Sequence, residues 1–202
     1  MSDEMALMPG ATTIGVVCKD GVILASEKRM SYGYFVMSKT AKKVFKITEN
    51  IGAACAGLVG DMQVLTKTAS AYVSLRSYER ERATSVRSAA KIMSNTLFER
   101  RYFPIMSQTI VAGVDEEGPH LFVLDPIGSV IEDRYASVGS GAEIATGVLE
   151  GEYKEGMSID EGMKIVSKAA KSAGARDVGS GNVLDVLIIT KDNTKEETIN
   201  LA

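Results

Sequence analysis

The sequence predicts an α+β fold in which antiparallel sheets pack on each other with helices on the outside. Runs of alternating apolar residues mark groups of short strands, and apolar residues at helical spacing mark two pairs of helices between those groups. The chain has 202 residues, 45% of them hydrophobic, which is enough for one domain with a full core. No repeat, low-complexity segment or linker indicates a boundary within it.

The beginning of the chain is predicted to be rich in strands. Residues 12–19 alternate around apolar positions, Asp20-Gly21 is a hairpin turn signal, and residues 22–28 return through a second apolar run. Further short strands are expected at residues 35–37, 44–47 and 51–56, and the last of these ends at Gly57. The chain therefore opens with a β-hairpin and continues as strands.

The spacing of apolar residues then becomes helical. Apolar positions recur every three or four residues from Leu65 to Arg76 and again from Val86 to Leu97, so two neighbouring amphipathic helices are expected. Three strands bounded by turn residues follow and predict an antiparallel meander; they span residues 109–114, 121–124 and 130–135.

The last part of the chain predicts a second pair of helices and two strands. One helix is expected over residues 144–153, and Ser158 with Glu161 three positions later is a capping box that begins the next helix. Strands at residues 183–190 and 197–201 close the chain.

Composition narrows the classes of function. The net charge of −3, the pI near 5.4 and the scattered Lys and Arg residues argue against a nucleic-acid partner. No apolar run approaches the roughly 18 residues of a membrane span, and residues 1–10 lack the pattern of a signal peptide, so we expect no membrane partner and a cytoplasmic location. Cys18 and Cys55 have no CxxC spacing, and one histidine, His120, is too few for a His-rich metal site or a His-based triad.

Six short blocks stand in a characteristic order along the chain. They are Thr12-Thr13-Ile14-Gly15, Ala25-Ser26-Glu27-Lys28-Arg29, Lys42-Lys43, Ala56-Gly57-Leu58-Val59-Gly60-Asp61, Gly139-Ser140-Gly141 and Arg176-Asp177-Val178-Gly179-Ser180-Gly181. From position 11 onwards the chain resembles the β-subunits of the proteasome core particle, which are N-terminal-nucleophile hydrolases. The resemblance implies a four-layer αββα sandwich of two antiparallel sheets flanked by helices, with residues 1–10 as a leader propeptide and residues 11–202 as a single domain.

In this family, cleavage after a glycine frees a threonine that becomes the nucleophile, and its own α-amine or a lysine network handles the proton. In this chain Gly10 is followed by Ala11, so the resemblance places alanine at the nucleophile and processing position. Because a methyl group cannot attack a carbonyl, we expect the chain to be inactive and to keep residues 1–10. Thr12 is a poor substitute, because a shift of one residue along a strand turns the side chain to the opposite face.

The resemblance implies that the rest of the catalytic site is present. Lys43 would lower the pKa of the nucleophile, Glu27 would orient and neutralise Lys43, and Gly57 would donate its N–H to the developing oxyanion. The polar residues expected to hold the free amine are Ser140, Asp177 and Ser180. Taken alone, Glu27 and Lys43 could equally be a surface ion pair, Gly57 and the Gly139 to Gly141 block could be turns, and Asp177 could be a helix cap.

The substrate implied by the resemblance is an extended polypeptide that pairs with the segments around Ser31 and Gly57 by strand addition. The residues that correspond to the side-chain pocket beside the nucleophile are Met30, Ala41, Phe45, Cys55 and Val59. They are apolar or nearly so, which favours hydrophobic residues before the cleaved bond. Phe45 and Val59 would look equally ordinary as core residues.

Two functions remain open. The first is a threonine-type endopeptidase subunit that degrades unfolded proteins inside a chamber of stacked rings, here inactivated at Ala11. The second is a natural non-catalytic β-subunit that only builds the ring. Retention of the polar site residues favours an engineered substitution in an active subunit, because a site released from catalysis has no chemical reason to keep them.

The resemblance also implies partners and disfavours two related families. The expected partners are proteasome α-subunits, other β-subunits in heptameric rings, a regulatory ATPase and polypeptide substrates, with no cofactor or metal. The short leader and the block from Arg176 to Gly181 disfavour an α-subunit, and that block and the chain length fit the bacterial two-component peptidase less well. The short leader resembles that of archaeal members.

Overall fold

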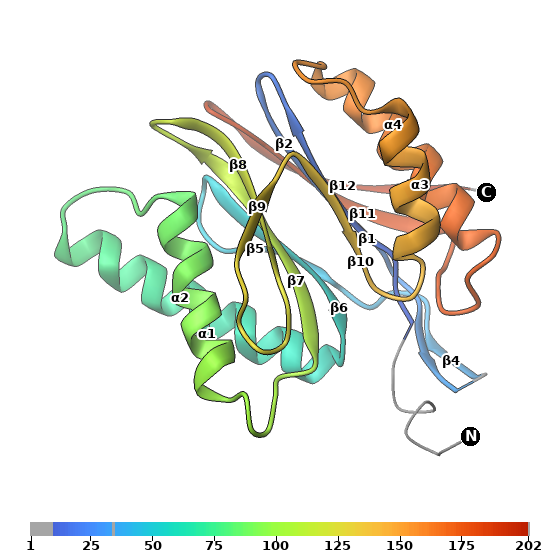
Figure 1. The fold of residues 1–202 in the computed structure, drawn as a ribbon, viewed down its shortest axis with the longest axis horizontal. Helices are drawn as coiled ribbons and strands as arrows, with labels where there is room; N and C mark the ends of the chain where they lie inside the picture. Colours follow the sequence, from blue (N-terminus) through green and yellow to red (C-terminus); the bar gives the residue numbers. More distant parts are fainter. Residues whose placement is uncertain (1–9, 34, 202) are drawn as a thin grey trace.

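Two five-stranded antiparallel sheets stack face to face, and a pair of helices covers the outer face of each sheet (Figure 1). The computed structural model describes residues 10–33 and 35–201, which contain four helices and twelve strands. The expected four-layer αββα sandwich is confirmed. Residues 1–9, which make up most of the expected leader, lie outside the described residues.

The first sheet contains both ends of the described chain. Its strands lie in the order β10-β1-β2-β11-β12, and helices α3 and α4 cover its outer face. The elements are β1 (Thr13–Cys18), β2 (Gly21–Glu27), β10 (Tyr135–Val138), β11 (Val183–Thr190), β12 (Thr194–Asn200), α3 (Ala142–Glu152) and α4 (Ile159–Gly174). The expected capping box is confirmed, since the Ser158 hydroxyl accepts the Glu161 N–H and the Glu161 carboxylate accepts the Ser158 N–H.

The second sheet is formed by the middle of the chain. Its strands lie in the order β5-β6-β7-β8-β9, and helices α1 and α2 cover its outer face. The elements are β5 (Val44–Lys46), β6 (Ile51–Gly57), β7 (Ser107–Asp115), β8 (Gly118–Leu124), β9 (Ile131–Asp133), α1 (Val59–Glu79) and α2 (Val86–Glu99). A separate two-stranded sheet, β3 (Met30–Tyr32) with β4 (Phe35–Ser38), stands at one end of the sandwich (Figure 1).

Strand β1 shows how the sequence pattern builds the layers. Ile14, Val16 and Cys18 pack on α3 and α4, whereas Ala11 and Val17 belong to the apolar layer between the two sheets. All six residues of β1 are buried, because both faces of the first sheet are covered. Such a strand has apolar or small residues on both faces, which explains the nearly continuous apolar run in this part of the sequence.

The predicted strand at residues 130–135 is divided between the two sheets. Strand β9 pairs with β8 in the second sheet, and β10, which begins at Tyr135, pairs with β1 in the first sheet. The expected meander is thus formed by β7, β8 and β9, and the chain then crosses to the other layer. The pairing partner decides this division, and a partner that is distant in sequence leaves no local signal.

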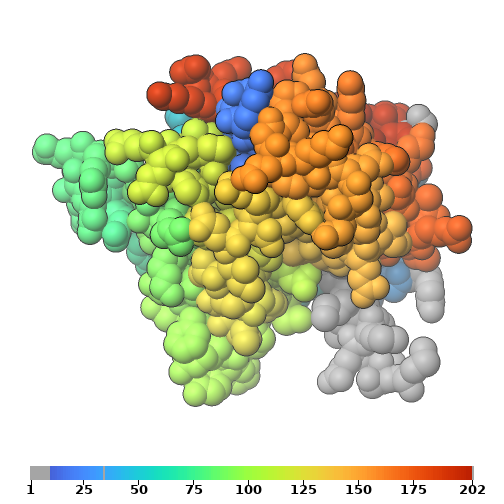
Figure 2. Space-filling model, turned by 45° about the horizontal axis from the view of Figure 1, so that its top comes forward, coloured from blue at the N-terminus to red at the C-terminus, as the bar shows by residue number. Residues whose placement is uncertain are grey.

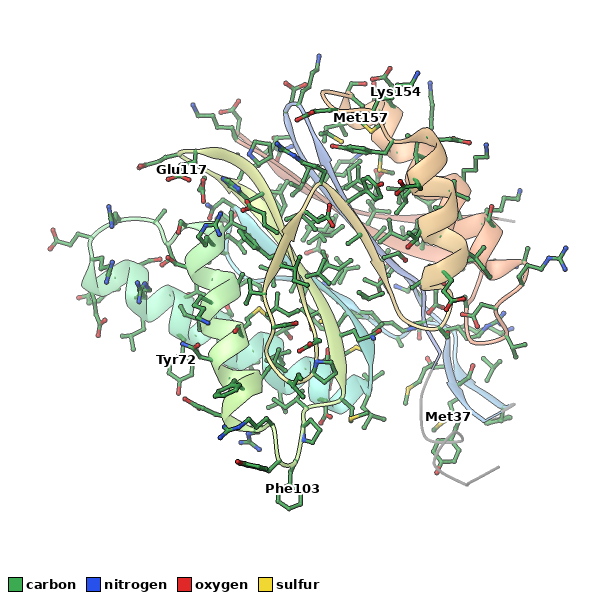
Figure 3. All side chains as sticks on the ribbon, in the orientation of Figure 1. Met37, Tyr72, Phe103, Glu117, Lys154 and Met157 are labelled. Atoms are coloured by element: carbon green, nitrogen blue, oxygen red, sulfur yellow. The ribbon has the colours of Figure 1, made fainter. Side chains whose placement is uncertain are left out.

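Apolar side chains that remain exposed lie mainly on the β3–β4 hairpin, on the outer helix α1 and in loops. Figure 3 shows Met37 on the β3–β4 hairpin and Phe103 in the loop after α2, both pointing outward, and they are 56% and 91% exposed. Figure 2 shows the helices α3 and α4 in orange beside the yellow segment that contains β9, on one face of the molecule. Among the described residues no helix combines the length and the apolar character needed to cross a membrane.

Candidate active site

Position 11 lies at the start of the first sheet, against the layer between the sheets. Ala11 is 1% exposed and precedes β1 by two residues. The Gly141 N–H donates to the Ala11 carbonyl at 3.2 Å, and the Glu27 N–H donates to the Thr12 carbonyl at 3.2 Å. The backbone at positions 11 and 12 is therefore held by the loop after β10 on one side and by the end of β2 on the other.

A chain of polar groups surrounds the backbone nitrogen of Ala11. Its N–H donates to the Ser140 hydroxyl at 3.0 Å, and that hydroxyl donates to Asp177 Oδ2 at 2.6 Å. The Ser180 hydroxyl donates to the same carboxylate oxygen at 2.6 Å. The three polar residues expected around the amine therefore lie together beside position 11, although they come from loops after β10 and after α4.

Asp177 also makes a local contact typical of a turn residue, and the next element after it is strand β11 rather than a helix. Its Oδ1 accepts the Gly179 N–H at 3.1 Å, two residues along the same loop. The local role as a turn residue is thus real, but it uses only one of the two carboxylate oxygens. The other oxygen is free to organise the hydroxyls of Ser140 and Ser180 around Ala11.

The Thr12 side chain lies on the opposite face of the chain from the Ala11 side chain and contacts the outer member of the polar cluster, Ser180. The Thr12 hydroxyl lies 2.6 Å from the Ser180 hydroxyl, and the side chain is 1% exposed. Thr13 returns to the layer between the sheets, where its hydroxyl donates to the Cys55 carbonyl at 3.0 Å. The alternation along the chain therefore places the Thr12 hydroxyl on the face opposite to Ala11, as the strand period requires.

Lys43 and Glu27 form a buried ion pair, so the alternative of a surface pair is wrong. Their side chains are 2% and 1% exposed, and Lys43 Nζ donates to Glu27 Oε1 and, at 2.6 Å, to the Arg29 carbonyl. Glu27 Oε2 accepts the N–H groups of Arg29 at 2.6 Å and Gly181 at 2.9 Å. Both charged groups are thus well supplied with partners, which burial of a charge requires.

Burial lowers the pKa of the Lys43 ammonium from its usual value of 10.5, and the Glu27 carboxylate opposes this shift. Desolvation disfavours the charged form of a lysine, while an adjacent carboxylate favours it. Burial is the larger of the two effects, so the net direction of the pKa shift is downward. A lysine whose pKa is shifted by burial beside a specific charge partner is typical of a functional site.

Gly57 ends β6 in a conformation that other residues rarely adopt. Its φ is +142°, and a Cβ at this position would lie 2.0 Å from the Met106 carbonyl oxygen. The Leu58 N–H donates to the same oxygen at 2.8 Å before α1 begins at Val59. Glycine is thus required because the segments at Gly57 and Met106 approach closely, independently of any contact with a substrate.

The expected substrate residues differ in accessibility. Met30, Ala41, Phe45 and Val59 are partly exposed, whereas Cys55 is fully buried. The Cys55 thiol accepts from the Thr109 hydroxyl at 3.6 Å, and burial raises the pKa of this thiol to about 11, so that it stays protonated at neutral pH. Among the described residues, the buried Ser31 hydroxyl has no hydrogen-bond partner.

Arg29 and Gly181 contact the buried ion pair, although the sequence pattern assigned no role to either residue. The backbone of Arg29 contacts both members of the ion pair, and its guanidinium donates to the Val178 carbonyl at 3.0 Å, in the loop that carries Asp177. Both residues lie inside blocks that the sequence singled out, beside Glu27 and Ser180. Their place within those blocks was the only sequence feature that pointed to them. Their contacts with the ion pair are made by backbone atoms, which residue type does not predict.

The layered fold and this cluster define the framework of an N-terminal-nucleophile hydrolase, with alanine two residues before β1. The sequence model of the family described as "Proteasome subunit" matches residues 8–189. The chain therefore belongs to the proteasome subunit family, as a β-type member similar to those of archaea.

Several archaeal relatives match this chain over nearly its full length. Proteasome subunit beta 1 of Nitrosopumilus maritimus is 49% identical over 191 residues, which cover 95% of this chain and 96% of that protein. Proteasome subunit beta 2 of Caldivirga maquilingensis is 46% identical over 201 residues, which cover 100% of both chains. Proteasome subunit beta 2 of Thermofilum pendens is 44% identical over 198 residues, which cover 98% of this chain and 97% of that protein.

Proposed function

We propose that this chain is a β-subunit of a proteasome core particle whose threonine-type endopeptidase site is complete except for the nucleophile. The observation that carries the proposal is the network around Ala11: its N–H already donates to the Ser140 hydroxyl, which Asp177 holds at 2.6 Å. A free α-amine at the same place would meet the same acceptor. Only the hydroxyl that attacks a carbonyl is missing.

The proposed roles follow from the contacts of each group. In a chain with threonine at position 11, Lys43 would favour the ionised nucleophile, and Glu27 with its two backbone donors would hold Lys43 in place. The Gly57 N–H would stabilise the oxyanion, a role worth roughly 3 to 4 kcal/mol where such donors have been removed from hydrolases. The pocket residues Met30, Ala41, Phe45, Cys55 and Val59 would accept a hydrophobic side chain of an unfolded polypeptide.

With alanine at position 11 the chain neither cleaves substrates nor sheds residues 1–10. Its contribution is then to build a heptameric ring with other β-subunits, against a ring of α-subunits, in a cytoplasmic particle that a regulatory ATPase supplies with unfolded chains. The second candidate function is a subunit that has only this structural role. Ala11 itself favours that candidate, whereas the buried pair of Lys43 and Glu27 favours a peptidase site.

Restoring the missing hydroxyl distinguishes these two functions. We expect Ala11→Thr, in the assembled particle, to lose residues 1–10 and to cleave a fluorogenic hydrophobic peptide, while the unchanged chain does neither. Intact mass reports the loss of the leader, and fluorescence reports cleavage. The double variant Ala11→Thr/Thr96→Val is a control that should remain active, because the Thr96 hydroxyl donates to the Ile92 carbonyl within helix α2, away from the site.

Two results would count against the proposal. An unchanged chain that begins after Gly10 in the assembled particle would show that processing does not need a threonine at position 11. An Ala11→Thr chain that assembles, but neither sheds its leader nor cleaves any hydrophobic peptide, would favour the purely structural subunit.

A further inference from the structure

We infer that Gln108 is a positioning residue of this site, which sets the separation between position 11 and the backbone N–H of Gly57. The inference rests on the proposed peptidase function, because it concerns the geometry of the same site. Gln108 was not among the residues that the sequence analysis assigned to the site, and its side chain is exposed.

Gln108 joins the two sheets of the sandwich with one hydrogen bond. It lies on β7 opposite Ala56 of β6, one residue before Gly57. Its Oε1 accepts the N–H of Gly139 at 2.9 Å, and Gly139 follows β10 of the other sheet. The strand that ends at Gly57 is therefore tied, through its neighbour in the second sheet, to the loop that carries Ser140.

That loop determines where the backbone of position 11 lies. Gly139 has a φ of +101°, and a Cβ on it would lie 2.2 Å from the Ala11 carbonyl oxygen and 3.0 Å from the Ala56 side chain. The next two residues hold Ala11 directly, since Ser140 accepts its N–H at 3.0 Å and the Gly141 N–H donates to its carbonyl at 3.2 Å. Gly139 is thus packed between position 11 and the strand that leads to Gly57.

The bond from Gln108 therefore controls a distance that matters for acyl transfer. The nucleophile must approach the carbonyl carbon while the oxyanion donor contacts the carbonyl oxygen, so a small misplacement of one group relative to the other slows the reaction. Gln108 itself contributes little to the core, because its exposed side chain lies between the buried residues Ser107 and Thr109 on the strand. Its removal should loosen the site and leave the fold intact.

The test compares variants of Gln108 in a chain with Ala11→Thr, assembled in the particle. Loss of one net hydrogen bond corresponds to about fivefold in rate, so we expect Gln108→Ala to lower kcat for a hydrophobic peptide about fivefold with KM nearly unchanged. Gln108→Asn should do the same, because its shorter side chain does not reach Gly139. Gln108→Glu should restore most of kcat, because its carboxylate still accepts the Gly139 N–H.

Gln63→Ala is the matched control, since Gln63 is an exposed glutamine on α1, away from both sheets' facing surfaces. We expect it to leave kcat unchanged, and thermal unfolding should show that both variants remain folded at the assay temperature. Equal kcat in Gln108→Ala and Gln63→Ala would overturn the inference while leaving the proposed function intact. So would a loss of kcat in Gln108→Glu as large as that in Gln108→Ala. If the parent Ala11→Thr chain is inactive, the proposed function fails first, and the inference fails with it.

Discussion

Replacing Lys43 by methionine tests whether the buried ion pair is a structural requirement of this fold. The side chains of Lys43 and Glu27 are 2% and 1% exposed, so solvent cannot take the place of a lost partner. Lys43 Nζ makes one bond to the Glu27 carboxylate and one to the Arg29 carbonyl. Hydrogen bonds that involve a charged group contribute about 1.5–3 kcal/mol each, which suggests a loss of about 3–5 kcal/mol.

The remaining contacts of Glu27 keep the cost from being larger. Its Oε2 still accepts the N–H groups of Arg29 and Gly181, so only Oε1 is left without a donor. Part of the unpaired charge is therefore still solvated by the backbone. We expect the double variant Glu27→Gln/Lys43→Met to recover part of the lost stability, because it removes the buried charge that the single variant leaves behind.

Urea unfolding of the full-length chain measures these free energies, and Lys42→Met is the matched control. Lys42 is the adjacent lysine, but its ion pair with Glu196 is exposed, with both side chains at 53%, so its removal should cost about 0–1 kcal/mol. A Lys43→Met variant within 1 kcal/mol of Lys42→Met would refute the reasoning, because the pair would then have to be accessible to water.

Three further predictions concern pH, glycine positions and a helix cap. Because the pKa of Lys43 is lowered in the folded state, the unfolded chain binds more protons than the folded chain between that pKa and 10.5. The free energy of unfolding should therefore rise with pH through this window. Urea unfolding at several pH values should show this rise, and Lys43→Met should lack it. Gly52→Ala should cost about 1–3 kcal/mol of stability in thermal unfolding, because its Cβ would lie 2.4 Å from a leucine side chain between the sheets. Gly147→Ala, which has open space on α3, should gain about 0.5–1 kcal/mol. A Gly52→Ala variant more stable than Gly147→Ala would contradict this packing. Ser85→Ala should cost about 1 kcal/mol because the Ser85 side chain caps α2, and Ser74→Ala on the exposed face of α1 is its control; equal stabilities would show that the cap contributes nothing.

Most of the secondary structure followed from local pattern. The turn signal at Asp20-Gly21, the helical spacing after Val86 and the capping box at Ser158 each depend on residues close together in the chain, and each produced the expected element. The strand predicted at residues 130–135 was divided because its two halves pair in different sheets. Strand β3 was not predicted, since Met30-Ser31-Tyr32 is short and contains no β-branched residue.

The residues of the candidate site were found by their order in the chain rather than by any local chemistry. Ser140, Asp177 and Ser180 do lie together beside Ala11, and Lys43 does meet Glu27, as the resemblance implied. The contributions of Gln108 and Arg29 were not foreseen. Gln108 accepts from a backbone N–H of a distant residue, and Arg29 contacts the ion pair through its own backbone N–H and carbonyl. Residue type reveals neither kind of contact.

The sequence by itself determined the layers, the family pattern and the absence of a hydroxyl at position 11, because these depend on residue identity and on short-range periodicity. Only the tertiary structure decided that Lys43 and Glu27 are a buried pair, that the Thr12 hydroxyl lies on the opposite face from Ala11, and that one glutamine ties the two sheets together at the site. These properties depend on which surfaces are covered and which distant atoms come within hydrogen-bond distance. Both are consequences of packing, and no local pattern of residues encodes them.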